Sequence, residues 1–358
     1  MKKIIIFSKN LHIGGMEKAL VTLINSIDDR KYNVTLVLEK LEGSLVNKLN
    51  KNIKIINYNL STRENVLIRK TINFIKKIRF IMKNYHKFDC SIDYATYSTF
   101  SSQMSRKCSK NSIIYIHSDY YNMYDGNICA VKNFFNKIGL TKFRKIIFVS
   151  KHSKDNIIKI MPEISNKAMV LGNLIDYKNI IEQSKEYKVD LDKNKINIVF
   201  VGRLEEHSKR ISELIEAVNS NKNLDKFNLY IIGNGPNEKE YKELAKTNNI
   251  FFVGELNNPY PYIKACDYLI LVSKYEGFPV VYNEATVLET KIITTVLVED
   301  ELIKYDENNV IELNSNINNF DDIINEILSK KDKFKDNKID YNKINESKLN
   351  KLYKLIEV

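Results

Sequence analysis

The sequence of 358 residues has no tryptophan, only four cysteines and five prolines, and no apolar run long enough to span a membrane. The apolar stretch Lys2 to Phe7 is too short for a signal peptide and predicts a first strand. No tandem repeat, heptad array or proline-rich linker is present. Without metal-ligand spacing or an export signal, the cysteines are expected to be reduced and largely packed: Cys90, Cys108, Cys129 and Cys266. These absences predict a cytoplasmic protein.

The composition that remains is that of a folded, basic protein. A hydrophobic content of 44% supports packed cores, and 358 residues fit two domains better than one. The formal charge of +12 predicts attraction to polyanions such as nucleic acid, anionic lipid or nucleotide phosphates. Charge alone cannot choose among them, but no nucleic-acid recognition motif is present, and we expect no nucleic-acid partner.

Short apolar runs alternate with helix-length segments along most of the chain, which is typical of parallel βαβ units. The pattern pauses between Tyr177 and Lys195 and then restarts. We therefore predict two tandem Rossmann-like domains facing a central cleft, over residues 1–176 and 177–340, with a helix over 341–358 returning to the first domain. The expected strands are Ile4 to Phe7, Val34 to Leu38, Ile53 to Ile56, Ser112 to Ile116, Ile146 to Val149, Ile196 to Val201, Leu229 to Ile232, Ile250 to Val253, Tyr268 to Val272 and Ile292 to Thr295.

The segment Val272 to Glu289 holds two glutamates eight positions apart, Glu276 and Glu284, around a Gly-Phe-Pro turn. The run before it predicts a buried strand, and Pro279 suits the first position of a helix. Such a junction offers backbone N–H groups to an anion, while the carboxylates accept hydrogen bonds from hydroxyls. The segment suits a phosphorylated sugar. The alternative is that both glutamates only decorate the surface.

Basic residues stand at a second junction of this kind. Gly202 and Arg203 follow a predicted strand, and Lys209 and Arg210 begin the predicted next helix. Cations that converge beside a strand end suit a diphosphate leaving group. A solvated basic helix start is the alternative, but that end of the helix dipole disfavours cations.

Glycine-containing loops follow three other strands. Gly14 and Gly15 precede a helix and would let the backbone approach a ligand, although they form no G-x-G-x-x-G fingerprint and an ordinary turn is the alternative. The turn at residues 233–236 is interpreted as structural. Glu255 and Leu256 follow the next strand, where they could border a nucleotide base.

His117 follows a strand of the first domain and should face the cleft. A lone histidine is also compatible with a packed or surface role. Its neighbours Asp119, Tyr120 and Tyr121 form a polar aromatic patch that could receive an acceptor carbohydrate, because tyrosine offers both a stacking face and a hydroxyl.

The segment Arg63 to Lys87 carries eight basic residues and one acid. Helical periodicity predicts one stripe that packs on the sheet, formed by Ile68, Ile72, Ile75, Met82 and Tyr85. It predicts a second stripe that faces outward, formed by Arg69, Lys76, Phe80 and Lys83. An outward basic stripe with a phenylalanine is typical of an interfacial membrane contact. A solvated helix face is the alternative.

Taken together, these segments resemble the retaining glycosyltransferases of family 4, which have the GT-B fold. The resemblance extends from Lys3 to about Thr295. It rests on blocks in the expected order, GGMEKAL, GRLEEHSKRISELIEA, IIGNGP and FFVGELNNPYPYIKACDYLILVSKYEGFP followed by NEA, and on the E-x7-E spacing of Glu276 and Glu284. It implies a nucleotide-sugar donor bound mainly by the second domain, an acceptor bound mainly by the first, and metal-independent transfer with retention at the anomeric carbon.

The resemblance also implies roles by position. Arg203 and Lys209, beside Gly202, would bind the donor diphosphate and stabilise the leaving group. Glu276 would contact the donor-sugar hydroxyls, and Glu284 would hold the ribose. The remaining implied contacts are His117 near the transfer point, Gly277 and Phe278 near the sugar and phosphates, and Gly15 toward the phosphates. The donor phosphate itself would help to deprotonate the acceptor.

We therefore expect a glycosyltransferase at the inner face of the cell membrane that adds one sugar to a glycan or lipid-linked glycan, as in capsule, wall or lipopolysaccharide assembly. We expect no cofactor and no metal. One alternative is a sugar-nucleotide epimerase, which also has two Rossmann-like domains. Another is a catalytically degenerate glycosyltransferase that serves as a binding partner, suggested by Glu289-Thr290-Lys291 where the family has Gly-x-Pro and by the acidic stretch Glu299 to Glu301.

Overall fold

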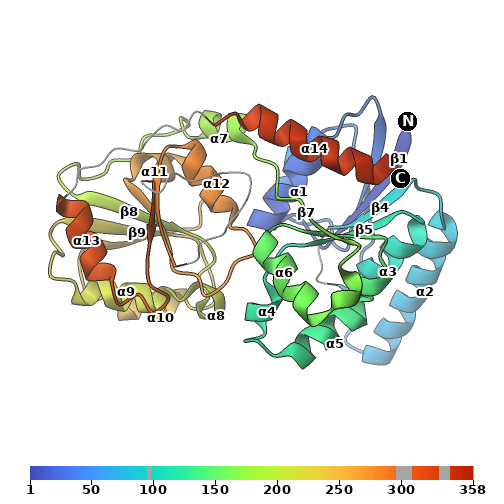
Figure 1. Cartoon of the computed structure of the whole chain (residues 1–358), viewed down its shortest axis with the longest axis horizontal. Coiled ribbons are helices and arrows are strands. Elements are labelled where there is room, and N and C mark those ends of the chain that lie inside the picture. The colour runs from blue at the N-terminus through green and yellow to red at the C-terminus, as the bar shows by residue number, and fades with distance from the viewer. Residues whose placement is uncertain (95–97, 296–308, 330–338, 358) are drawn as a thin grey trace. The chain divides into compact units, whose positions relative to one another are not determined.

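The chain forms two compact units in the computed structural model, which describes residues 1–94, 98–295, 309–329 and 339–357 (Figure 1). Unit 1 comprises Met1–Ile175 and Asn342–Val358, and unit 2 comprises Asp176–Tyr341. The sequence-based prediction ended the first domain at residue 176 and the second at residue 340. The acidic stretch Glu299 to Glu301 lies outside the described residues.

Unit 1 is built on a seven-stranded sheet with the order β3-β2-β1-β4-β5-β6-β7, in which every pair of neighbours is parallel. The inner strand β1 is buried on both faces, as parallel strands covered by helices are. The strands are β1 (Lys2–Ser8), β2 (Tyr32–Leu38), β3 (Lys54–Asn57), β4 (Cys90–Asp93), β5 (Ser112–Ile116), β6 (Lys145–Phe148) and β7 (Ala168–Val170).

Helices connect these strands and cover the sheet. Ile5 and Phe7 of β1 pack with Met104 and Cys108 of α3 in one core cluster. The helices of unit 1 are α1 (Gly15–Ser26), α2 (Val66–Asn84), α3 (Thr99–Cys108), α4 (Tyr120–Met123), α5 (Ile128–Ile138), α6 (Lys151–Ile160) and α14 (Tyr341–Glu357), with 3-10 turns at Ser44–Lys48, Leu140–Lys142 and Pro162–Ile164.

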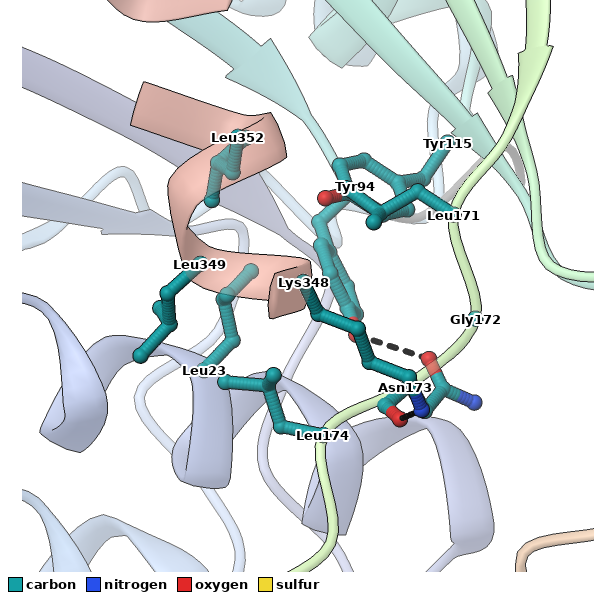
Figure 2. A pocket seen from close by; sticks show the side chains of 10 residues that line it. All are labelled: Leu23, Tyr94, Tyr115, Leu171, Gly172, Asn173, Leu174, Lys348, Leu349 and Leu352. Atoms are coloured by element: carbon teal, nitrogen blue, oxygen red, sulfur yellow. Dashed lines mark hydrogen bonds between the residues drawn. The ribbon is translucent and has the colours of Figure 1, made fainter. Parts of the chain in front are cut away.

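The C-terminal helix α14 packs on unit 1. Tyr353 stacks on Tyr32 with ring centroids 4.8 Å apart, and its hydroxyl accepts a hydrogen bond from the Asp28 backbone N–H at 3.0 Å. Figure 2 shows the small hollow beside the helix, where the buried ammonium of Lys348 donates to the backbone carbonyl of Asn173 at 2.5 Å. Residues from the two ends of the chain thus share one core.

Unit 2 repeats the same plan with six parallel strands in the order β10-β9-β8-β11-β12-β13. Its strands are β8 (Ile196–Val201), β9 (Phe227–Ile232), β10 (Ile250–Gly254), β11 (Tyr268–Leu271), β12 (Lys291–Thr294) and β13 (Val310–Glu312). Its helices are α7 (Tyr177–Gln183), α8 (Glu206–Lys209), α9 (Ile211–Ser220), α10 (Glu238–Leu244), α11 (Tyr260–Ala265), α12 (Val280–Val287) and α13 (Phe320–Ser329).

The predicted fold class of two parallel α/β units is confirmed. All ten predicted strands are present: β5 and β8 have the predicted bounds, and the ends of the others shift by one or two residues. Three further strands, β4, β7 and β13, were not predicted. These three strands have four, three and three residues, and two of them carry polar side chains, CSID and VIE. Such short runs give no periodic signal.

Two further expectations concern cysteines and membrane spans. Cys90, Cys108 and Cys266 are buried, whereas Cys129 is exposed. Burial raises the pKa of the Cys90 and Cys108 thiols to about 12. None of the helices within the described residues combines the length and the apolar content that a bilayer crossing requires.

Candidate functional site

The main candidate site of unit 2 lies at the carboxyl edge of its sheet, where β8 and β11 are neighbours but the chain leaves them toward opposite ends of the sheet. Open α/β sheets bind ligands at this topological switch point. Gly202 and Arg203 follow β8 there, and the loop at residues 272–279 joins β11 to α12. The strand, loop and helix predicted around Glu276 are present.

Lys209 and Glu276 form an ion pair at this edge, although they are 67 positions apart in the chain. Their side chains are only 20% and 15% exposed, so water screens the pair weakly. Ser273 joins both residues: its hydroxyl donates to the Glu276 carboxylate at 2.7 Å and accepts from the Lys209 ammonium at 3.4 Å. A cation and a hydroxyl-binding carboxylate thus stand side by side.

The backbone at Gly233 and Gly235 packs so closely against the segment after β8 that neither position has room for a side chain. A Cβ on Gly233 would lie 1.9 Å from the carbonyl oxygen of Gly202, and one on Gly235 would lie 2.1 Å from that of Leu204. Gly233 also has a φ of +143°, which only glycine adopts readily. The structural interpretation of this turn agrees with these contacts. Lys209 lies over Gly202, with its Cε 3.9 Å from a Cβ built there.

The other two cations of this segment, Arg203 and Arg210, have different surroundings. Arg203 is exposed, and its guanidinium has no hydrogen-bond or ion-pair partner among the residues that the structure describes. The expectation that Arg210 joins a cation cluster is wrong, because its guanidinium donates to the backbone carbonyls of Val272 and Ser273 at 2.9 and 3.4 Å. Lys209 does not begin a helix either; it ends the short α8, where the helix dipole favours a cation.

Glu284 lies on α12 and is 3% exposed. The hydroxyl of Tyr260 on α11 donates to its carboxylate at 3.1 Å. Burial first, and then the Glu284 carboxylate, raise the pKa of Tyr260, so this hydroxyl stays protonated as a donor. Gly277 and Phe278, in the loop between the two glutamates, are buried.

Glu255 and Leu256 follow β10 on the same sheet. Glu255 is exposed and accepts a hydrogen bond from the Asn234 amide at 2.5 Å, and Leu256 is half-buried. Among the described residues of the chain, no group of three or more histidine, cysteine, aspartate and glutamate side chains gathers as a metal site would require.

In unit 1, Gly15 is the exposed first residue of α1 and Gly14 precedes it. Gly14 lies against the Glu17 carboxylate, since a Cβ there would be 2.3 Å from Oε2. Burial raises the pKa of Glu17. The first-turn amides of α1 therefore lie beside a carboxyl group that is protonated more readily than that of an ordinary glutamate.

His117 packs against two tyrosines at the carboxyl end of β5. Its ring centroid is 4.4 Å from that of Tyr94 and 5.6 Å from that of Tyr115. Burial lowers its pKa to about 3, although a hydrogen bond with the Tyr94 backbone acts in the opposite direction. The imidazole is therefore neutral, and its buried Nε2 has no partner within the described part of the chain.

The acceptor-side candidates after His117 need correction. Tyr120 is 3% exposed and stacks on Phe134 at 4.7 Å, so it belongs to the core. Asp119 is buried as well; it caps α4 through the Tyr121 backbone N–H at 3.2 Å and lies 3.2 Å from the His152 imidazole. Tyr121 is half-buried against the same core. Capping and packing, not carbohydrate contact, explain Asp119 and Tyr120.

The predicted faces of α2 are largely reversed. Phe80, expected outside, packs edge-on against Phe7 and Tyr58 with centroids 6.0 and 5.6 Å away. Lys76 and Arg69 are half-buried, and the Lys76 ammonium donates to the Asn59 carbonyl at 2.6 Å. Of the expected inner stripe, Ile72 is half-buried and four residues are exposed, Ile68, Ile75, Met82 and Tyr85. Lys83 is exposed as predicted.

The reversal has a physical cause. The helix carries apolar residues on both sides, so periodicity alone cannot choose the inner one. Phe80 packs against the aromatic rings of Phe7 and Tyr58. Asn73 and Lys76 form hydrogen bonds with backbone groups of the loop beside the helix: the Ser61 backbone N–H donates to Asn73 at 2.8 Å, and Lys76 donates to the Asn59 carbonyl. Tertiary hydrogen bonds of this kind leave no trace in a hydrophobic pattern.

Sequence reasoning missed two site residues, Ser273 and Tyr260. Ser273 follows β11 directly and bridges the ion pair. Its place at a strand end, three residues before Glu276, was the available signal. Tyr260 lies in the block that carries the resemblance, but nothing local marks its distant partner.

Three comparisons with known proteins bear on this site. Residues 181–345 match the family model described as "Glycosyl transferases group 1". A relative from Campylobacter jejuni is 24% identical over 82% of this chain and 81% of its own length. It is the N-acetylgalactosamine-N,N'-diacetylbacillosaminyl-diphospho-undecaprenol 4-alpha-N-acetylgalactosaminyltransferase.

Solved structures of similar fold cover the whole chain. Staphylococcus aureus TarM, in a mutant complex with fondaparinux, alpha-GlcNAc-glycerol and UDP, has a TM-score of 0.75 at 13% identity and covers 100% of both chains. Anabaena Alr3699/HepE in complex with UDP-glucose has a TM-score of 0.73 at 16% identity, over 99% of this chain and 100% of its own. The chain is a glycosyltransferase of the GT-B type.

Two glycines in unit 2 of this glycosyltransferase, Gly233 and Gly254, allow a matched pair of substitutions. Gly233→Ala combines a positive φ with a clash against the Gly202 carbonyl. Gly254→Ala has a φ of +87°, and beyond its two chain neighbours no heavy atom of the described residues lies within 4 Å of the added Cβ. We expect Gly254→Ala to lower the free energy of unfolding by about 1–2 kcal/mol. The clash should cost Gly233→Ala about 1–3 kcal/mol more.

Urea denaturation of both variants checks this difference. Donor-induced stabilisation should also be lost in Gly233→Ala, because the clash displaces the backbone that carries Gly202. Equal destabilisation by the two substitutions would contradict the close approach of β8 and β9 at this edge.

The lowered pKa of His117 predicts a pH dependence of stability. As pH falls below about 6.5, the unfolded chain takes up a proton on this residue, while the folded chain resists protonation until about pH 3. The contribution of His117 to the free energy of unfolding should therefore fall as the pH falls across this window. In His117→Gln the slope should be shallower.

The difference between the two denaturation curves, measured from pH 7 to pH 4, isolates His117. Buried Asp93 works in the opposite direction, because burial raises its pKa to about 7, but this contribution is common to both proteins. Parallel curves would show that His117 protonates freely in the folded state.

Proposed function

We propose that this glycosyltransferase moves one sugar, with retention, from a nucleotide-sugar donor held by unit 2 to a glycan or lipid-linked glycan acceptor in surface polysaccharide assembly. The observation that carries the proposal is the pairing of Lys209 with Glu276 through Ser273 at the switch point of unit 2. A nucleotide sugar places a diphosphate next to sugar hydroxyls. The site places an ammonium next to a carboxylate in the same way.

Each donor group then has a matching partner. Arg203 and Lys209 neutralise charge that develops on the diphosphate as the glycosidic bond breaks, which is metal-independent stabilisation of the leaving group. Glu276 accepts hydrogen bonds from the sugar, and Glu284 from the ribose. Retention and the part of the donor phosphate in deprotonating the acceptor follow from the resemblance to family 4.

The acceptor class is supported by the Campylobacter relative, whose name describes an undecaprenol-linked acceptor. In unit 1, the unpartnered Nε2 of neutral His117 suits a hydroxyl of the reacting sugars. A sugar-nucleotide epimerase would convert the donor without any acceptor, and a degenerate glycosyltransferase would bind the donor without turnover.

Ligand-induced thermal shifts separate the roles of Lys209 and Glu276. Among UDP-, GDP- and ADP-sugars, one class should stabilise the wild type, by about 2.7 kcal/mol at a hundred times its dissociation constant. Lys209→Ala should weaken the shift with the nucleotide sugar and with the nucleoside diphosphate alone. Glu276→Gln should weaken only the shift with the nucleotide sugar, because its contact is with the sugar.

Turnover is measured as release of nucleoside diphosphate, with NMR of the product to read the anomeric configuration. Lys209→Ala should lower kcat by a factor on the order of 10²–10³, the usual effect of removing one charge-stabilising donor. Near-wild-type turnover of this variant would refute the phosphate role. An inverted product would refute retention, and donor conversion without acceptor would establish the epimerase.

We also propose that the enzyme works at an anionic membrane surface, through the exposed face of α2. Leu67, Phe74 and Met82 are 76%, 58% and 74% exposed and follow one another at helical spacing. Of the 15 large hydrophobic side chains that are exposed among the described residues, eight lie between Val66 and Tyr85. Figure 1 shows α2 at the margin of unit 1, beside α3.

The charge of α2 favours lipid over other occupants. The helix has six basic residues and no acid, and exposed Lys70 and Arg79 flank the apolar stripe. In a symmetric contact between two copies, these cations would face one another. An apolar stripe with cations on both sides suits the boundary between acyl chains and anionic headgroups.

Vesicle sedimentation checks this surface. A triple variant with Leu67, Phe74 and Met82 changed to Gln should lose at least roughly tenfold in binding to phosphatidylglycerol vesicles, because the apolar area that enters the bilayer is removed. Phosphatidylcholine vesicles should bind the wild type less, since they lack the anionic charge.

The matched control replaces exposed apolar residues elsewhere on unit 1, Leu41, Met123 and Ile128, by Gln. This variant should bind phosphatidylglycerol vesicles like the wild type. Equal losses in both variants would indicate a nonspecific effect of hydrophobicity. A wild-type dimer that the α2 variant abolishes would assign the face to a second copy instead.

A further inference from the structure

Arg210 occupies an unusual position between α8 and α9. Its φ and ψ are 48° and 43°, in the left-handed region that residues with a Cβ rarely adopt. This conformation is costly for arginine and costs glycine almost nothing. A side chain that stays in such a place must have contacts that compensate for the backbone.

Those contacts use the whole guanidinium group. Arginine has five N–H donors, and the structure offers five acceptors. Nε donates to the Val272 carbonyl at 2.9 Å, and Nη2 to the Ser273 carbonyl at 3.4 Å and the Thr295 hydroxyl at 3.1 Å. Nη1 donates to the Ser315 carbonyl and to the Glu213 carboxylate, the latter at 3.4 Å.

Four of the five acceptors follow the carboxyl ends of three neighbouring strands, and the fifth, Glu213, lies on α9. Val272 and Ser273 follow β11, Thr295 follows β12, and Ser315 follows β13. Thr295 reinforces the arrangement, because its hydroxyl also donates to the Ser273 carbonyl at 2.8 Å. One side chain therefore joins the ends of β11, β12 and β13 to the segment that carries Lys209.

Two neighbouring contacts extend this connection to the site. The backbone N–H of Lys274 donates to the Ser208 carbonyl at 2.8 Å, which joins the loop after β11 to α8. The Ser273 hydroxyl holds Glu276 at 2.7 Å. The residue before Arg210 is Lys209, and the residue whose carbonyl it binds is Ser273.

We infer that Arg210 is a positioning residue that fixes the loop bearing Ser273 and Glu276 against the segment bearing Lys209. It touches neither donor nor acceptor. This inference rests on the proposed function for its effect on transfer, but the geometry of the loop is independent of it. Neither lysine nor glycine can replace arginine here: lysine has only three donors on one atom, and glycine relieves the backbone but removes every contact.

The test compares Arg210→Gly and Arg210→Lys with Glu213→Gln. The control removes the charge of a partner that is 41% exposed and belongs to no strand end. Without ligand, amide hydrogen exchange at Lys274 should be at least roughly tenfold faster in both Arg210 variants and unchanged in the control. With a nucleotide sugar that the wild type turns over, both Arg210 variants should show a higher donor KM and a kcat at least roughly tenfold lower, with an unchanged acceptor KM.

The outcomes distinguish the two proposals. Wild-type exchange at Lys274 together with wild-type kcat in Arg210→Gly would overturn the positioning role and leave only a turn that tolerates glycine. Rescue by Arg210→Lys would show that charge suffices and would also overturn it. If the wild type turns over no nucleotide sugar, the proposed function fails, while the exchange comparison still decides the role of Arg210. If Arg210→Gly does not fold, the comparison is made with Arg210→Lys, which keeps the charge.

Discussion

The ion pair between Lys209 and Glu276 is the interaction on which the site of unit 2 depends. Opposite charges that are only 20% and 15% exposed attract strongly, and each would be costly to leave alone in a place so poorly hydrated. Ser273 bridges them, and the lysine stem lies over Gly202, whose carbonyl the Gly233 backbone approaches closely. The same two charges that stabilise each other without a ligand are those that a sugar diphosphate would engage.

Hydrogen bonds along the rest of the sheet edge hold the segments that carry this pair and Glu284. Arg210 joins three strand ends, Thr295 shares one of its acceptors, and Tyr260 holds Glu284 from the neighbouring helix. None of these residues needs to contact a substrate. Their contribution is to reduce the freedom of the loop, because a preorganised site does not pay for ordering when the donor binds.

Much of the fold and part of the site could be predicted from sequence. Alternating apolar runs identified ten strands, and the order of the blocks predicted that Gly202, Arg203, Lys209 and Glu276 belong to one site. Three short strands, the burial of Tyr120 and the inner face of α2 could not be predicted. In each case a tertiary contact decides: a neighbouring strand supplies the hydrogen bonds, Phe134 covers the ring, and Phe7 and Tyr58 receive Phe80.

The sequence by itself determined the parallel α/β class and the glycosyltransferase resemblance, because strand period, helix period and motif order are local or follow the order of the chain. Only the tertiary structure decided which cation meets Glu276 and which one binds backbone carbonyls. Lys209 and Arg210 are adjacent and carry the same charge, so charge and periodicity give no basis for separating them, and only the resemblance singled out Lys209. The left-handed backbone at Arg210 sends the two side chains to different neighbours, and those neighbours lie more than sixty residues away in the chain.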